Sequence, residues 1–181
     1  LVLSILAGVE LASLAARFPA ATGLVRVMPN LAAAIGKSPV ALFAHGLDAA
    51  GQGAVTALMR PLGLPEWLAD EAQFDLVTAL AGSGPAFVYR FIDALAAGAA
   101  ALGLPREQAD RLALAMVEGA AALAAASPDA PGELARRVAS PGGTTEAGLR
   151  VLDADRALGG LAEATLKAAA NRSAELAKAA R

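Results

Sequence analysis

The stretch LVLSILAG, residues 1–8, decides the fold class of the first part of the chain. It is a nearly continuous apolar run, which is typical of a strand covered on both faces in a parallel sheet. Residues 9–18 then show helical spacing and stop before Pro19. The two segments together predict a strand followed by a helix, as in an α/β domain.

The next segments extend this α/β pattern. Residues 24–28 (LVRVM) predict a second strand that stops at Pro29 and Asn30, and residues 40–44 (VALFA) predict a third. A glycine-rich region at residues 46–53 leads into a helix that ends near Pro61. This β-α-β-β order resembles the closing part of a dinucleotide-binding domain. We therefore assign residues 1–62 to the C-terminal portion of a Rossmann-type NAD(P)-binding domain.

The glycine-rich turn that binds a pyrophosphate is missing from this segment. Neither the Gly-x-Gly at residues 51–53 nor the one at residues 82–84 has the required third glycine, because Thr56 and Phe87 stand there. In a Rossmann fold this turn follows the first strand, so we expect it to precede Leu1 in a longer protein. The apolar start lacks a basic leader, which argues against a secretory signal.

From about residue 75 onward the sequence predicts only helices, separated by glycine and proline breakers. We expect them at residues 75–81, 85–102, 105–126, 131–138 and 145–152, and from about residue 155 to the end. The helix at 85–102 is apolar on almost every face, so we expect it to be buried nearly all round with the help of a partner subunit. In the last helix, Leu158, Leu161 and Leu176 are expected to face a core. The chain as a whole is therefore predicted to be mainly α.

The composition excludes several classes of function. Hydrophobic residues make up 56% of the 181 residues against 18% charged, and the net charge is −2 without a dense run of Lys and Arg. Nothing therefore indicates nucleic-acid or membrane binding. The chain has no cysteine, which excludes disulfides and thiolate chemistry, and its single His45 cannot build a histidine-rich metal site. A reducing cytoplasm is the expected compartment.

The sequence SPGGTT, residues 140–145, lies between two predicted helices and is a candidate anion-binding loop. Pro141 fixes its own φ, the two glycines allow backbone geometries closed to other residues, and Thr144 or Thr145 can cap the following helix. Exposed N–H groups at such a helix start suit a carboxylate or a phosphate. An ordinary turn between two helices has the same composition, and both interpretations stay open at this point.

Three motifs in one order give the chain a resemblance to a known family. They are RVMPN at residues 26–30, TALAGSGPA at residues 78–86, and SPGGTT at residues 140–145 with Gly148. Together they resemble pyrroline-5-carboxylate reductase, over about residues 1–176. The resemblance implies an oxidoreductase of proline biosynthesis that reduces 1-pyrroline-5-carboxylate to L-proline with NADPH or NADH. It also implies that residues 63–181 form a helical substrate-binding and dimerisation domain, and that the protein is a homodimer or higher homo-oligomer.

The resemblance also implies roles for individual residues. It places the substrate on the loop, with the carboxylate at Ser140, Gly142, Gly143 and Thr144 and the hydroxyl of Thr145, the catalytic residue, beside the ring nitrogen. It places the ribose and nicotinamide of the cofactor at the ends of the first two strands, at Ala7, Gly8, Pro29 and Asn30. No metal ion is implied.

The chain departs from the family's pattern in two ways, and two other functions are alternatives to this assignment. The family commonly continues Met-Pro-Asn with Thr-Pro, whereas this chain has Leu31 and Ala32. Without the glycine-rich turn, we expect the chain to bind NADPH poorly on its own and its catalytic competence to be in doubt. A non-catalytic helical dimerisation module is therefore one alternative. A hydroxyacid dehydrogenase is the other and ranks lower, because no lysine stands in a catalytic setting.

Overall fold

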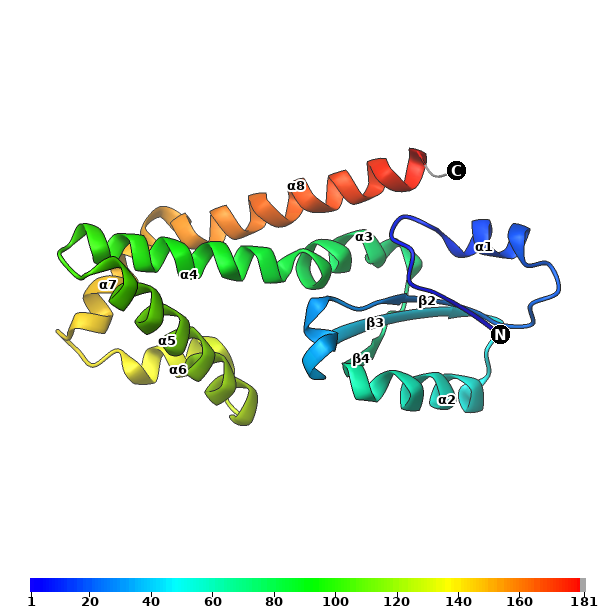
Figure 1. The fold of residues 1–181 in the computed structure, drawn as a ribbon, viewed down its shortest axis with the longest axis horizontal. Helices are drawn as coiled ribbons and strands as arrows, with labels where there is room; N and C mark the ends of the chain where they lie inside the picture. Colours follow the sequence, from blue (N-terminus) through cyan, green and yellow to red (C-terminus); the bar gives the residue numbers. More distant parts are fainter. Residues whose placement is uncertain (180–181) are drawn as a thin grey trace. The chain divides into compact units, whose positions relative to one another are not determined.

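The structure is a computed structural model that describes residues 1–179 and contains two compact units (Figure 1). Unit 1 comprises Leu1–Pro85 and the chain from Glu163 onward, and unit 2 comprises Ala86–Ala162. The predicted boundary between residues 62 and 63 thus falls inside unit 1. The mainly α fold with a small α/β part is as predicted.

Unit 1 is built on a mixed four-stranded sheet with the spatial order β1-β2-β3-β4. The strands are β1 (Val2–Ser4), β2 (Leu24–Met28), β3 (Ser38–His45) and β4 (Gly63–Trp67). Strand β1 runs parallel to β2, β2 runs antiparallel to β3, and β3 runs parallel to β4. The prediction for residues 24–28 is confirmed, and β3 is longer than predicted.

Two predictions about the sheet are wrong. The first strand ends at Ser4 rather than at Gly8, because the chain turns there: the Ser4 hydroxyl accepts a hydrogen bond from the Leu6 N–H, and Gly8 has φ +75°. The fourth strand, GLPEW, was not predicted. Pro65 within it lacks an N–H donor, which a strand tolerates only at the edge of a sheet, and β4 is an edge strand.

Strand β2 sends alternate side chains to the two faces of the sheet. One face packs on α2 (Ala49–Met59), and its buried residues are Val25, Val27, Val40, Leu42 and Val55. The other face packs on α1 (Leu11–Arg17) and α3 (Phe74–Val77), through Leu11, Leu14, Leu24, Met28 and Phe74. Figure 1 shows α1 and α2 on opposite sides of the strands. The alternation also sends the charged Arg26 toward the α1 and α3 face.

Short helical turns complete unit 1. They are η1 (Leu31–Ile35), η2 (Arg60–Leu62), η3 (Glu71–Gln73) and the π-helical turn η4 (Thr78–Gly82). The C-terminal helix α8 (Ala157–Ala179) returns to this unit, where the Ser173 hydroxyl donates to the Asp75 carboxylate at 2.7 Å. The backbone of Ala177 lies against Gly8, where an added Cβ would be 3.3 Å from the Ala177 Cα.

Unit 2 is entirely helical. It contains most of α4 (Gly84–Ala101), then α5 (Arg106–Ala126), α6 (Pro131–Val138), α7 (Thr144–Asp153), η5 (Ala154–Arg156) and the first turns of α8. Arg106 joins α4 to α5 by bonding Asp93 at 2.6 Å and Asp110 at 2.8 Å. The hydrogen bond from Arg106 lowers the pKa of Asp93.

The chain by itself does not bury the large apolar side chains of its long helices. The burial of residues 85–102 was expected with a partner subunit and stays a prediction, whereas the leucines expected to face a core on the last helix are not buried within the chain. The buried core of unit 2 consists of Ala96, Ala109 and Ala113, with Ile92 and Ala99 beside them. On α4, Val88, Tyr89, Phe91 and Leu95 are 37 to 61% exposed, and on α8, Leu158, Leu161 and Leu176 are 43 to 67% exposed. Small side chains thus make the contacts within the unit, while the large apolar ones remain on its surface.

No single helix among residues 1–179 is long and apolar enough to cross a membrane. Helices α5 and α6 meet the length and composition test only as a pair, and they are bent by 119° at the break between them.

Candidate functional site

The loop at residues 139–143 is a tight turn that delivers the chain into α7. The carbonyl of Ser140 accepts a hydrogen bond from the Gly143 N–H at 2.9 Å. Pro141 occupies the second position of this turn, and Gly142 occupies the third with φ +71°. A positive φ at the third position is the mark of a type II turn, in which proline is common at the second position. The local sequence therefore accounts for the loop without help from distant contacts.

The N–H groups of this loop differ in their availability. The Gly142 N–H donates to the Glu146 carboxylate at 2.7 Å, and the Gly143 N–H closes the turn. Thr144 and Thr145 open α7, and within residues 1–179 no acceptor lies on their N–H groups, as is usual for the first turn of a helix. Of the predicted backbone donors, those of the two glycines are thus engaged.

Glu146 is a residue of this loop that the sequence reasoning missed. Its carboxylate binds the Gly142 N–H and lies 3.5 Å from the Arg150 guanidinium, so the loop already holds one carboxylate, from its own helix. A signal for it exists in the sequence, because an acidic residue at the third position of a helix commonly reaches back to the N–H groups before it. The positive end of the α7 dipole adds to this preference for an anion.

Gly143 has no room for a side chain. A Cβ built on it would lie 2.5 Å from the Ser140 hydroxyl oxygen and 3.0 Å from the Ser140 carbonyl oxygen. The Ser140 hydroxyl therefore lies directly over the Gly143 backbone. Ser140 and Gly143, both assigned to the substrate, are therefore closely packed against each other.

The residues assigned to the cofactor lie at one edge of the sheet in unit 1. Ala7 and Gly8 follow β1, and Pro29 and Asn30 follow β2. Because β1 and β2 are parallel, both strands end at the same edge, which is where ligands bind in sheets of this kind. This common edge, together with the exposed Ala7, fits part of a nucleotide cofactor.

Asn30 uses its side chain for structure. Its Oδ1 accepts from the Ala32 N–H and its Nδ2 donates to the Ala81 carbonyl, each at 2.8 Å. Its own N–H donates to the Ser38 hydroxyl at 2.8 Å. Asn30 thus caps η1 and ties the end of β2 to the π-helical turn, so that two of the three sequence motifs meet. Because the side-chain amide of Asn30 is engaged in these hydrogen bonds, a ligand would contact the backbone of Asn30 or an exposed part of its side chain.

The segment at residues 82–85 forms a junction between two helices, as its glycines and proline predict. The Ser83 N–H donates to the Thr78 carbonyl, which closes the π-helical turn, and α4 begins at Gly84. Such π-helical turns are frequent at functional sites. No ligand contact is assigned to Ser83.

The predicted site residues are divided between the two units. Ala7, Gly8, Pro29 and Asn30 belong to unit 1, and residues 140–145 belong to unit 2. Each set is brought together within its own unit: the first at a single sheet edge, the second in a single turn.

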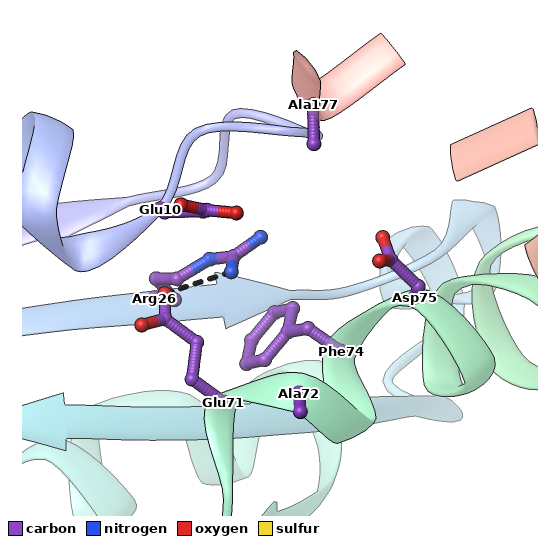
Figure 2. Close-up of a pocket in the computed structure, with 7 residues that line it drawn as sticks. All are labelled: Glu10, Arg26, Glu71, Ala72, Phe74, Asp75 and Ala177. Atoms are coloured by element: carbon purple, nitrogen blue, oxygen red, sulfur yellow. Dashed lines mark hydrogen bonds and ion pairs between the residues drawn. The ribbon is translucent and has the colours of Figure 1, made fainter. Parts of the chain in front are cut away.

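Unit 1 also contains a cavity of about 250 Å³ beside Arg26 that the sequence did not predict (Figure 2). The Arg26 guanidinium bonds the Glu71 carboxylate at 2.8 Å and stacks 4.1 Å from the centre of the Phe74 ring. The Arg26 side chain is only 6% exposed. A charged residue within the otherwise apolar strand LVRVM was the one sign of this ion pair in the sequence, but it does not reveal the partner 45 residues away.

Known proteins are similar to this chain along nearly its whole length. The family model for pyrroline-5-carboxylate reductase dimerisation matches residues 71–176. The pyrroline-5-carboxylate reductase of Pseudomonas aeruginosa is 42% identical over 179 residues, which is 98% of this chain and 65% of the relative. The enzyme of that name from Pisum sativum is 42% identical over 178 residues, 97% of this chain and 64% of the relative. The chain thus spans less than two thirds of the length of these relatives.

Solved structures agree with the sequence comparison. A pyrroline-5-carboxylate reductase from Coxiella burnetii has a TM-score of 0.91 and 35% identity, over 96% of this chain and 64% of its own. A Plasmodium falciparum pyrroline carboxylate reductase with NADP bound has a TM-score of 0.80 and 26% identity, over 98% of this chain and 71% of its own.

Proposed function

Since the chain belongs to the pyrroline-5-carboxylate reductase family, we propose that it takes part in the reduction of 1-pyrroline-5-carboxylate to L-proline with NADPH or NADH. The membership rests on the match to residues 71–176 and on relatives about 40% identical, and it confirms the resemblance drawn from the three motifs. In the reaction, the imine carbon gains a hydride and the ring nitrogen ends with a proton. The family is thus settled, and the roles of the individual residues are our proposal.

The observation that carries the proposal is the loop at residues 140–145. It binds a carboxylate in the structure, because the Gly142 N–H holds Glu146 at 2.7 Å. We assign the substrate carboxylate to Ser140, Gly142, Gly143 and Thr144. The N–H groups of Thr144 and Thr145 point out of the first turn of α7 and suit a further anion. Binding through Gly142 requires that the Glu146 carboxylate give up this N–H or share it.

Thr145 is the residue that we place beside the reacting nitrogen. It is half-buried in the first turn of α7, where a substrate held by its carboxylate at the same turn comes within reach of the side chain. Its hydroxyl can hydrogen-bond the ring nitrogen and orient the ring. No strong general acid is needed, since an imine that binds in its protonated form already carries the proton of the product amine.

The nicotinamide cofactor supplies the hydride when it is bound. We assign its ribose and nicotinamide to Ala7, Gly8, Pro29 and Asn30, at the common edge of the parallel strands β1 and β2. The related structure from Plasmodium falciparum with NADP bound supports this class of cofactor. NADPH and NADH both remain candidates for this chain.

Replacing Thr145 with alanine tests the catalytic assignment. We expect kcat/KM for the imine to fall about tenfold, the value of one lost hydrogen bond, while the KM for NADPH stays unchanged. Thr145→Ser keeps the hydroxyl and should restore most of the rate. NADPH oxidation with 1-pyrroline-5-carboxylate measures both variants, in this chain and in one extended upstream by a strand and a glycine-rich turn, because the chain by itself is expected to bind NADPH poorly. Equal rates for Thr145→Ala and the wild type would remove Thr145 from the site, and no turnover by the wild type would leave the chain with the role of a non-catalytic dimerisation module.

A homo-oligomer is the partner that we propose, because the matched family model describes a dimerisation domain and large apolar side chains on α4 are exposed. The wild type should sediment with at least twice the 18.0 kDa of one chain. Phe91→Asp places a charge among those side chains and should shift the protein to monomers. Lys37→Ala, at an exposed position in unit 1, should leave the oligomer intact. A monomeric wild type in sedimentation equilibrium would contradict the assignment.

The cytoplasm is the location that we propose, from the absence of cysteine.

A further inference from the structure

The helix α1 follows directly on the loop that carries Ala7 and Gly8, and the side chain of its N-cap residue does not cap its first turn. Its N-cap residue, Glu10, makes no side-chain capping hydrogen bond. The N–H of the next residue, Leu11, instead donates to the Glu71 carboxylate at 2.8 Å, across 60 positions of sequence. Glu71 therefore does for α1 what an N-cap side chain does in other helices.

The same carboxylate oxygen also holds Arg26. The Glu71 Oε1 accepts from the Arg26 Nη1 at 2.8 Å (Figure 2). One atom thus joins the start of α1 to the middle of β2. Arg26 lies opposite Ser4 of β1 and three residues before Pro29. The two loops assigned to the cofactor, after β1 and after β2, are thus connected through Glu71.

The position of Glu71 is itself fixed. It is the first residue of η3, where the Asp70 carboxylate accepts from the Ala72 N–H at 2.9 Å and so caps the turn. Phe74, only 2% exposed, anchors the other end of the turn in the core and lies under the Arg26 guanidinium at 4.1 Å. A hydrogen bond to a carboxylate held this firmly is stronger than one between neutral groups, because the acceptor is charged and already oriented.

We propose that Glu71 is a positioning residue for the cofactor. By holding the first N–H of α1 against β2, it sets the distance between the Ala7–Gly8 loop and the Pro29–Asn30 loop. Gly8 adds a second restraint, since it lies close to Ala177 of α8, where an added Cβ would be 3.3 Å from the Ala177 backbone. Loss of the Glu71 contact leaves that loop free to move relative to β2, and the cofactor then has to order it on binding. The inference rests on the proposed function, which places the cofactor at these loops.

A pair of substitutions at Leu11 tests the contact between α1 and Glu71. Leu11→Pro removes the N–H donor and puts the proline Cδ in its place, so the Glu71 carboxylate has to withdraw from the start of α1. Proline suits this first position of a helix, and the extended backbone of Glu10, with φ −79° and ψ 159°, suits the residue before a proline. Leu11→Ala is the matched control, because it shortens the same buried side chain and keeps the N–H.

Two measurements on these variants test the inference. Amide exchange followed by NMR should be faster at residues 7–10 in Leu11→Pro than in Leu11→Ala. NADPH titration should give a Kd about tenfold weaker for the proline variant, with the KM for the imine equal in the two. Glu71→Gln, which keeps an oxygen acceptor, should bind NADPH better than Glu71→Leu, which has none.

The outcomes separate this inference from the proposed function. Equal exchange at residues 7–10 in the two Leu11 variants overturns the role of Glu71. Faster exchange with an unchanged NADPH Kd overturns its link to the cofactor. A wild type that does not bind NADPH even when the chain is extended upstream by a strand and a glycine-rich turn overturns the cofactor assignment and this link with it. The exchange comparison still decides whether Glu71 holds the loop.

Discussion

Replacing Gly143 with valine is expected to lower kcat/KM for the imine by about a hundredfold or more. The added Cβ would lie 2.5 Å from the Ser140 hydroxyl oxygen and 3.0 Å from its carbonyl oxygen. The valine therefore has to displace Ser140 and open the turn that the Ser140 carbonyl and the Gly143 N–H close at 2.9 Å. A displacement of about 1 Å in groups that position a substrate commonly costs about a hundredfold in rate.

Most of this loss should appear as a higher KM for the imine, because the loop is assigned to the substrate carboxylate. The KM for NADPH should stay unchanged, since its assigned contacts lie in unit 1. Gly132→Ala is the matched control: this glycine lies in α6 shortly before the loop, and a Cβ on it meets no atom within 4 Å in the described chain. Thermal unfolding of both variants should match the wild type within a few degrees, because the loop is exposed. A Gly143→Val protein with normal kinetics would show that the loop does not bind the substrate.

Replacing Gly63 with alanine is expected to destabilise unit 1 by roughly 4 kcal/mol or more, beyond most single substitutions. Gly63 has φ +144° and lies opposite Ser38 in the pairing of β3 with β4. A Cβ there would lie 2.1 Å from the Ser38 carbonyl oxygen and 2.5 Å from its nitrogen. Both atoms belong to the backbone of a fully buried residue, so neither can move aside without breaking the register of the two strands.

The matched control for this prediction is Gly53→Ala. Gly53 lies in the interior of α2, and a Cβ on it meets nothing within 4 Å in the described chain. Alanine in the interior of a helix is more stable than glycine by about 0.5–1 kcal/mol. Urea unfolding should therefore move the midpoint up for Gly53→Ala and strongly down for Gly63→Ala. A Gly63→Ala protein as stable as the wild type would mean that β4 does not pair with β3 in this register.

Where local chemistry decides a conformation, the sequence predicts it well. The apolar run at residues 24–28 is a strand with those bounds, and Pro131 opens a helix that ends at Val138, as predicted. The turn at residues 140–143 also follows from its own residues, because proline and glycine occupy the positions that a type II turn requires. In each case the determining contacts lie within a few residues of one another.

The candidate site is predictable to the same extent. The loop at residues 140–145 and the strand ends at Gly8 and Asn30 could be found from motifs and from the rule for parallel strands. The hydrogen bonds that these residues make within the chain could not be predicted. The amide of Asn30 reaches Ala81 across 51 positions, and the Gly142 N–H is taken by the carboxylate of Glu146. Which hydrogen bonds form depends on the groups that the fold brings together, and a local sequence pattern does not predict them.

By itself, the sequence determined the family, the mainly α class, the position of β2 and the order of the helices. The family followed from the resemblance carried by the three motifs. The rest followed from periodicity, helix breakers and glycine–proline turns, which act over a few residues. Only the tertiary structure decided the short edge strand β4, the burial of small rather than large side chains in unit 2, and the bond from Leu11 to Glu71. These depend on residues 13 to 60 positions apart, and the free energies of such contacts arise from packing that exists only once the chain has folded.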